Sequence, residues 1–246
     1  MSEIVKTEAV VLSKINYGDT SLIISVYTEM FGKISVIIKG GRNPKSRFGM
    51  IADTLNHVQL VIYKKDNREL QLLSNIDLLS HYPRIREDIG KTQYALAITE
   101  LVKKLTVENE SNKKLFKGLV KILLLIDSGK EHPGILHGRF YLFFLSELGY
   151  ALQVTKCGIC TSEIGKRSGG FSYETGFVCV NCCESHPGLN FISAELLDYF
   201  FCLINNLTVS NISIDLMKQA FIFLEQYTKH HIPDFSGTQT LNFFNH

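Results

Sequence analysis

The chain has 246 residues, of which 45% are hydrophobic and 11% aromatic, enough apolar side chain for one large core or two smaller ones. Charged residues make up 20% and the formal net charge is +2, so an argument for nucleic-acid binding must come from local clusters. The first residues, MSEIVKTEAV, contain no signal-peptide pattern, and the apolar runs at 122–126 and 140–145 are too short to span a bilayer. We therefore expect a soluble, cytoplasmic protein without a membrane partner.

The first 80 residues have the pattern of a β domain. Short runs rich in Val, Ile and Thr alternate with turn signals such as Gly40-Gly41, which predicts strands at 9–13, 21–28, 33–38, 57–63 and 70–76. Five strands in so short a segment favour a small barrel, because an open sheet would expose its edges. An OB-fold and an SH3-like barrel both fit this strand count. The strand count alone does not separate these two folds, so we expect a small barrel domain over residues 1–80.

From Pro83 onward the apolar residues recur at helical spacing. Pro133 suits a first helical turn and Gly149 a helix end, while Ser193 and Ser213 are placed as N-caps. We expect a helical domain over residues 81–246, so that the fold class is a multidomain β plus α protein. Its predicted helices cover residues 85–105, 113–126, 133–148, 193–205 and 213–230.

Two CxxC pairs stand 18 residues apart in the predicted helical domain. In a reducing cytosol, matched CxxC pairs favour a metal over disulfides, and four thiolates complete a tetrahedral zinc site. Such a site has no open position for substrate, so we expect one structural Zn²⁺ per chain. The ligands are Cys157, Cys160, Cys179 and Cys182, in a zinc-ribbon-like insertion at 157–182 with a short hairpin, GFSYETGFVC.

Other interpretations of these cysteines are a redox CxxC, an iron–sulfur site or unligated thiols. A redox motif needs only one pair, which favours the metal here. Cys183 can replace Cys182 as the fourth ligand, although Cys182 keeps the two-residue spacing. Cys202 lies in an apolar helical pattern and is expected to be a buried small side chain.

A basic segment, FGKISVIIKGGRNPKSRFGM, covers residues 31–50 and has no acidic residue between Glu29 and Asp53. In a nearly neutral chain it predicts a local positive field. Loops and one sheet face of a small barrel commonly bind single-stranded nucleic acid, and Tyr17 and Phe48 can offer stacking faces. The alternative is a solvated loop without a partner. The candidate contacts are Lys33, Lys39, Arg42, Lys45 and Arg47, with Lys14 and Tyr17 as weaker candidates.

No catalytic arrangement is evident in the sequence. GxxxxGK[ST] does not occur, so no P-loop is expected. His137 is expected to be a surface or a satisfied core histidine and not a general base, and the stripe at 140–145 is expected to belong to a helix core. Lys229, His230 and His231 suit a helix C-terminus better than a metal site. We therefore expect no enzyme activity.

Three segments of the chain form a familiar series, namely YGDTSLI with FGKISVIIKG and the basic loop after it, FYLFFLSELGYALQVTKCGIC, and FSYETGFVCVNC. These segments resemble the RecO family of bacterial DNA repair and recombination mediators, and the resemblance implies that the barrel over residues 1–80 is a nucleic-acid-binding OB-fold. Their order and spacing match the family over nearly the whole chain. The resemblance implies an N-terminal OB-fold, a helical domain that holds zinc, and no enzyme activity.

The resemblance also implies what the protein binds. Family members bind single- and double-stranded DNA, anneal complementary strands, contact the acidic C-terminal tail of the single-stranded-DNA-binding protein, and act with RecR to help RecA load. It makes Lys39, Arg42, Lys45 and Arg47 the DNA contacts of a nucleoid-associated protein. The rival hypotheses are a zinc-ribbon adaptor without DNA affinity and a thiol-redox enzyme.

Overall fold

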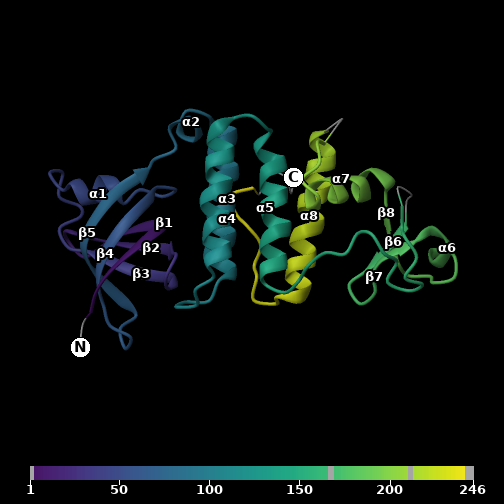
Figure 1. Cartoon of the computed structure of the whole chain (residues 1–246), viewed down its shortest axis with the longest axis horizontal. Helices are drawn as coiled ribbons and strands as arrows, with labels where there is room; N and C mark the ends of the chain where they lie inside the picture. Colours follow the sequence, from purple (N-terminus) through teal and green to yellow (C-terminus); the bar gives the residue numbers. More distant parts are fainter. Residues whose placement is uncertain (1–2, 166–168, 210–212, 242–246) are drawn as a thin grey trace. The chain divides into compact units, whose positions relative to one another are not determined.

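The computed structural model describes residues 3–165, 169–209 and 213–241. The chain divides into two compact units, residues 1–133 and 134–246, and each is described separately. Together they form a mixed β plus α protein, with the larger sheet at the N-terminus and most of the helices after it (Figure 1). The boundary predicted after residue 80 coincides with the end of β5, where the chain changes from strands to helices inside the first unit. That this boundary separates two domains stays a prediction.

The first unit begins with five strands that close into a barrel in the order β1-β2-β3-β5-β4. Valine and isoleucine alternate with more exposed residues, so one face of every strand points into a shared core that includes Ile24, Val36 and Leu60. All five predicted strands are confirmed, although β1 and β5 are longer than predicted. The strands are β1 (Glu3–Tyr17), β2 (Ser21–Thr28), β3 (Gly32–Ile38), β4 (His57–Lys64) and β5 (Leu70–Ser80).

β1 closes the barrel because it pairs along both of its edges. Residues 3–10 pair with β4 and residues 9–17 pair with β2, with an irregularity between Val11 and Ser13. The other closing contact is a short parallel pairing of β3 with β5. A short helix, α1 (Arg47–Ile51), lies between β3 and β4 and was not predicted.

Three helices complete the first unit, and α3 and α4 pack side by side (Figure 1). The side chains of Asp88 and Asn112 cap α3 and α4 by accepting hydrogen bonds from the backbone N–H groups of Lys91 and Leu115. Both helices contact β1, so they cover part of the outer surface of the barrel. The helices are α2 (Pro83–Arg86), α3 (Ile89–Leu105) and α4 (Lys113–Ser128).

The second unit joins three longer helices to a small sheet of order β7-β6-β8. The predicted caps Ser193 and Ser213 are confirmed, since each hydroxyl accepts a hydrogen bond from a backbone N–H three residues later. The predicted hairpin is β6 and β7, but β8 makes the region more than a hairpin inserted among helices. The elements are α5 (Pro133–Glu147), β6 (Gly169–Ser172), β7 (Gly176–Cys179), α6 (Val180–Cys183), β8 (Asn190–Ile192), α7 (Ala194–Ile204) and α8 (Ile214–His231).

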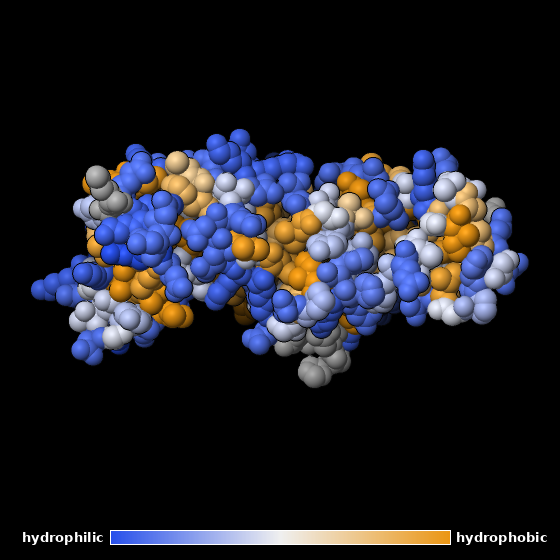
Figure 2. Space-filling model, turned by 90° about the horizontal axis from the view of Figure 1, so that it is seen from below, coloured by the Kyte–Doolittle hydropathy of each residue, from blue (hydrophilic) through white to orange (hydrophobic). Residues whose placement is uncertain are grey.

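Among the described residues, no helix combines the length and apolarity needed to cross a membrane. On the face drawn in Figure 2, hydrophobic residues reach the surface in separate patches among hydrophilic ones. Some of the exposed apolar side chains belong to the barrel, including Ile4 and Ile15.

Gly32, at the start of β3, joins the barrel to the segment before α4. It has φ +64°, and a Cβ atom there would lie 1.8 Å from the carbonyl oxygen of Glu110. We predict that Gly32→Ala lowers the free energy of unfolding by about 2–4 kcal/mol, through left-handed strain and overpacking. Gly18→Ala is the control, because Gly18 has φ +54° with open space around it and should lose only about 1–2 kcal/mol. Urea unfolding of both variants measures the difference, and equal losses would contradict the close packing at Gly32.

The burial of His137 should make the stability of the second unit depend on pH. His137 lies buried in α5, 5.9 Å by ring centroid from both Tyr141 and Phe221, and burial lowers its pKa to about 4. In the unfolded chain this histidine has a pKa near 6.5 and takes up a proton below that pH, whereas in the folded protein it stays neutral down to about pH 4. The free energy of unfolding therefore falls as the pH drops below about 6.5. We expect a contribution of about 2 kcal/mol between pH 7 and pH 5. Urea unfolding at both pH values should show this loss reduced in His137→Phe and unchanged in His81→Gln, a substitution at an exposed histidine.

Candidate metal centre and nucleic-acid interface

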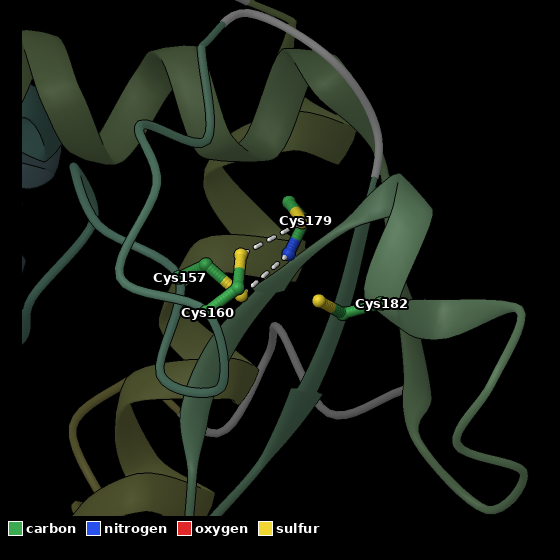
Figure 3. A group of neighbouring side chains, drawn as sticks. All are labelled: Cys157, Cys160, Cys179 and Cys182. Carbon is green, nitrogen blue, oxygen red and sulfur yellow. Dashed lines mark hydrogen bonds between the residues drawn. The ribbon is translucent and has the colours of Figure 1, made fainter.

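The four cysteines predicted to bind zinc lie together in the second unit (Figure 3). Two come from the turn before β6, one ends β7 and one lies in α6. Their sulfur atoms all lie within 4.8 Å of one another, and the Sγ atoms of Cys160 and Cys179 are 3.7 Å apart. Two thiolates bound at about 2.3 Å to one tetrahedral zinc lie about 3.8 Å apart, so this donor set fits the ion.

The backbone around Cys157 favours the thiolate form that a metal requires. Burial acts to raise the pKa of this thiol, but hydrogen bonds from backbone N–H groups outweigh burial and lower the pKa to about 6. One of these donors is the N–H of Cys179, 3.4 Å from the sulfur. The backbone therefore favours a thiolate at Cys157, whereas the neighbouring thiols, Cys160 first, raise the pKa of Cys182.

Cys183 and Cys202 lie outside the four-sulfur group. The Cys183 thiol faces the carbonyl oxygen of Val178 at 3.8 Å, and Cys202 lies on α7 and is partly buried. The arrangement thus favours Cys182 over Cys183 as the fourth ligand, in agreement with the two-residue spacing.

Aromatic rings connect the sheet beside the cysteines to the long helices of the second unit. Phe171 of β6 and Phe177 of β7 have ring centroids 4.8 Å and 5.6 Å from that of Phe223 on α8. Phe200 of α7 is 5.1 Å from the same ring. The cysteine cluster therefore lies beside strands whose rings form part of the core shared with α7 and α8.

The basic loop between β3 and α1 is fixed against the β1–β2 turn. The backbone N–H of Arg42 donates to the carbonyl oxygen of Thr20 at 2.9 Å, and its guanidinium donates to that of Gly18 at 2.8 Å. Lys39 and Lys45, on either side of Arg42, are exposed. Two loops from different parts of the chain thus form one surface at this end of the barrel.

The short helix α1 packs under this loop and carries the fourth cation. Phe48 and Ile51 pack on the barrel core, and a Cβ atom on Gly49 would lie 2.0 Å from the carbonyl oxygen of Gly41. Arg47 donates to the side-chain oxygen of Asn75 at 3.2 Å, and its guanidinium lies 5.3 Å from the Phe48 ring centroid. Arg47 is therefore oriented by the barrel, and the Phe48 ring is largely engaged by the core and by Arg47.

Lys33 lies apart from the other four predicted cations. It stands near the start of β3, whereas Lys39 follows the end of the same strand. Its ammonium donates to the carbonyl oxygen of Lys103 at 2.8 Å, and burial lowers its pKa although Glu108 acts to raise it. The weaker candidates are at the loop end: Lys14 is paired with Asp53, while Tyr17 is exposed.

Sequence reasoning missed α1, Asn75 and the close contact at Gly49. Gly49, the fourth glycine of the basic segment, was a signal for close backbone packing, whereas nothing local marks Asn75 as a partner of Arg47. His230 and His231, at the end of α8, stack on Tyr173 and Tyr150, as expected of a structural helix end. In the part of the chain that the structure describes, the four cysteines are the only group with metal-ligand proximity.

Two family models match consecutive parts of the chain. The family model described as Recombination protein O N terminal matches residues 1–82, and the one described as Recombination protein O C terminal matches residues 86–236.

Several proteins named DNA repair protein RecO are similar to this chain. That of Chlorobium luteolum is 36% identical over 167 residues, which cover 68% of this chain and 63% of the relative. That of Bacillus cytotoxicus is 33% identical over 183 residues, covering 74% and 72%. That of Chloroherpeton thalassium is 27% identical over 266 residues, covering 98% and 97%. With both family models matched in order along the chain, the protein belongs to the RecO family.

Proposed function

We propose that this protein is a non-catalytic, DNA-binding recombination mediator that acts in DNA repair. It binds single- and double-stranded DNA, promotes annealing of complementary strands, and helps a recombinase load on DNA coated with the single-stranded-DNA-binding protein. The observation that carries this proposal is the cation surface at the loop end of the barrel. This cation surface consists of Lys39, Arg42, Lys45 and Arg47.

The architecture of the barrel supports this proposal. We assign it to the OB-fold, whose ligands commonly bind on one sheet face and on the loops beside it, and the cation surface occupies such a loop. Lys33 is left out of the proposed surface because it is held at the other end of β3 by the carbonyl oxygen of Lys103. The remaining four cations sit on a positioned loop and helix, which suits contact with a regular row of phosphates.

The mechanism is binding without chemical reaction. Two strands anneal only if the repulsion between their phosphates is reduced, and a cationic surface does this by releasing the counterions condensed on each backbone. Contacts with phosphates carry no base information, so annealing by this surface accepts any complementary pair of sequences. The protein therefore contributes free energy of binding, and base pairing supplies the specificity.

The family suggests the partners and the location. We propose that the chain acts with RecR, that it binds the acidic C-terminal tail of the single-stranded-DNA-binding protein, and that it works at the nucleoid in the bacterial cytoplasm. Lys and Arg side chains bind such a tail through charge-assisted hydrogen bonds. Competition for this tail would loosen the coating protein from the strand that the recombinase needs.

We propose that the cysteine cluster holds one structural Zn²⁺ per chain. Cys157, Cys160, Cys179 and Cys182 would bind it as thiolates, and a four-thiolate site leaves no position for water or substrate. The ion would act as a cross-link between the first CxxC turn and the end of β7. Its role is then to hold the sheet that packs on α7 and α8, and the DNA surface lies on a separate unit.

The cation surface predicts a measurable salt dependence. If four cations each meet one phosphate of a single strand, the slope of log affinity against log salt is about −2.8, or about fifty-fold weaker binding at 200 mM than at 50 mM salt. The double variant Lys39→Gln/Lys45→Gln should reduce the slope to about −1.4. Fluorescence anisotropy with a labelled mixed-sequence strand measures both slopes.

Lys130→Gln is the control, because Lys130 is exposed and lies between α4 and α5, outside the barrel strands and their loops, so its loss should leave the slope unchanged. A slope that falls equally in the control, or that does not fall in the double variant, would show that the cation surface is not where phosphates bind.

Removal of zinc should affect the second unit and spare DNA binding. Cys160→Ser should lose the metal and lower the melting temperature, because the binding free energy of a structural metal is part of the folding free energy. Cys202→Ser and Cys183→Ser are controls that should keep one zinc per chain, measured by atomic emission. If Cys160→Ser kept its melting temperature but lost annealing, zinc would have a functional role and the structural assignment would be wrong.

A further inference from the structure

The four sulfur atoms of the cysteine cluster differ in their access to solvent. Cys157 is 1% exposed and Cys179 9%, whereas Cys182 is partly exposed and Cys160 is exposed. An oxidant dissolved in water therefore reaches Cys160 first. Four thiolates carry more negative charge than one Zn²⁺ neutralises, so a thiolate bound there remains open to oxidation when it faces solvent.

A second sulfur lies next to that of Cys160. A dashed line in Figure 3 joins the Sγ atoms of Cys160 and Cys179, which are 3.7 Å apart. The bond of a disulfide is about 2.05 Å long, so these two atoms need to approach by about 1.7 Å. The sulfur of Cys157 is buried instead and accepts a hydrogen bond from the N–H of Cys179. The arrangement therefore favours a disulfide between the two CxxC pairs over one within the first pair.

The backbone holds the first CxxC turn against β7 without help from a metal. The N–H of Gly158 donates to the carbonyl oxygen of Phe177 at 2.8 Å. A Cβ atom on Gly158 would lie 1.6 Å from the carbonyl oxygen of Thr175, so the turn lies directly on the β6–β7 hairpin. These contacts keep the sulfurs of Cys160 and Cys179 close together while the first of them reacts.

We propose that the cysteine cluster is a peroxide-sensitive site, at which oxidation joins Cys160 to Cys179 and releases the zinc. This inference rests on the proposed zinc site and deepens it, because it gives that site a second, metal-free state. The oxidant is hydrogen peroxide, and the change is a reversible modification of the protein without enzymatic turnover.

The reaction consumes one molecule of peroxide. The Cys160 thiolate attacks one peroxide oxygen, so an S–O bond forms, the O–O bond breaks and hydroxide leaves, which makes Cys160 a sulfenic acid. The Cys179 thiolate then attacks this sulfur, so the S–S bond forms, the S–O bond breaks and a second hydroxide leaves. Two protons from solvent convert both hydroxides to water. The sulfurs lose two electrons and the peroxide oxygens gain them.

The oxidised state keeps one connection and loses another. The disulfide ties the first CxxC turn to the end of β7, as the zinc would, so the rings of Phe171 and Phe177 keep their place beside Phe223. With two of its four ligands gone, the ion is released, and Cys182 then no longer ties α6 to the rest of the cluster. Residues 184–188, which follow α6, are all exposed. Oxidation should therefore loosen residues 180–188 and leave the aromatic core intact.

Treatment of the zinc-loaded protein with hydrogen peroxide tests the inference. We expect release of one zinc per peroxide consumed, followed with a coloured zinc indicator. Mass spectrometry of alkylated peptides should find the Cys160–Cys179 disulfide, and dithiothreitol with added zinc should restore the starting state. Hydrogen–deuterium exchange should become faster in residues 180–188 and stay unchanged in β6 and β7.

Two matched variants separate the reacting thiol from a mere ligand. Cys160→His and Cys182→His both leave three thiolates and one imidazole, a donor set that holds zinc. Cys160→His should release zinc about ten-fold more slowly than wild type, because the accessible thiolate is gone. Cys182→His keeps the reacting pair and should release zinc at the wild-type rate with the same disulfide. Cys183→Ser tests the adjacent thiol and should also behave as wild type.

The zinc content of the reduced wild-type protein, measured first by atomic emission, distinguishes the outcomes. Absence of zinc would remove both the proposed zinc site and this inference. Zinc that stays bound in peroxide, or that leaves without a disulfide, would keep the zinc site and overturn the inference. A disulfide within one CxxC pair or to Cys183 would also overturn it, and this mapping uses the wild-type protein alone.

Discussion

The pairing of β1 along both of its edges is the constraint on which the first unit depends. Residues 3–10 of this strand pair with β4 and residues 9–17 with β2, and the irregularity between Val11 and Ser13 lies just after the overlap of these two segments. Bulges bend a strand and increase its twist, which suits a strand that must follow a closed barrel. Closure brings the β1–β2 turn beside the loop after β3, so Arg42 can bond to Gly18 and Thr20.

The second unit depends on interactions that stabilise its small sheet. Its sheet has strands of three or four residues, which are too short to be stable alone. Two interactions compensate for this. The rings of Phe171 and Phe177 join the core beside Phe223, and the four cysteines converge on one point at the end of β7. A metal ion at that point would link segments that few backbone hydrogen bonds hold together.

The features of the fold and of the cysteine cluster that depend on nearby residues could be predicted from the sequence. Ser193 and Ser213 marked helix starts because a hydroxyl can cap a backbone N–H, and the CxxC spacing marked the cysteine cluster because two thiolates must meet one metal. The missed elements depend on distant partners: α1 is held by core contacts of Phe48 and Ile51, and β8 by pairing with β6. Lys33 and Lys39 are six positions apart in the sequence, but they lie at opposite ends of β3 because the strand is extended.

The bonds of Arg42 also have a thermodynamic consequence for recognition. A flexible lysine-rich tail loses conformational entropy when it binds and can adapt to almost any polyanion. Here, the loop is already held by the β1–β2 turn and by the packing of Gly49 against Gly41, so little further ordering accompanies association. In the proposed function, the cations would act as an array carried on a fixed backbone, and the distance between successive charges on a ligand would become a criterion for binding. An irregular acidic polymer of equal charge density would then fit this array less well than a nucleic-acid backbone.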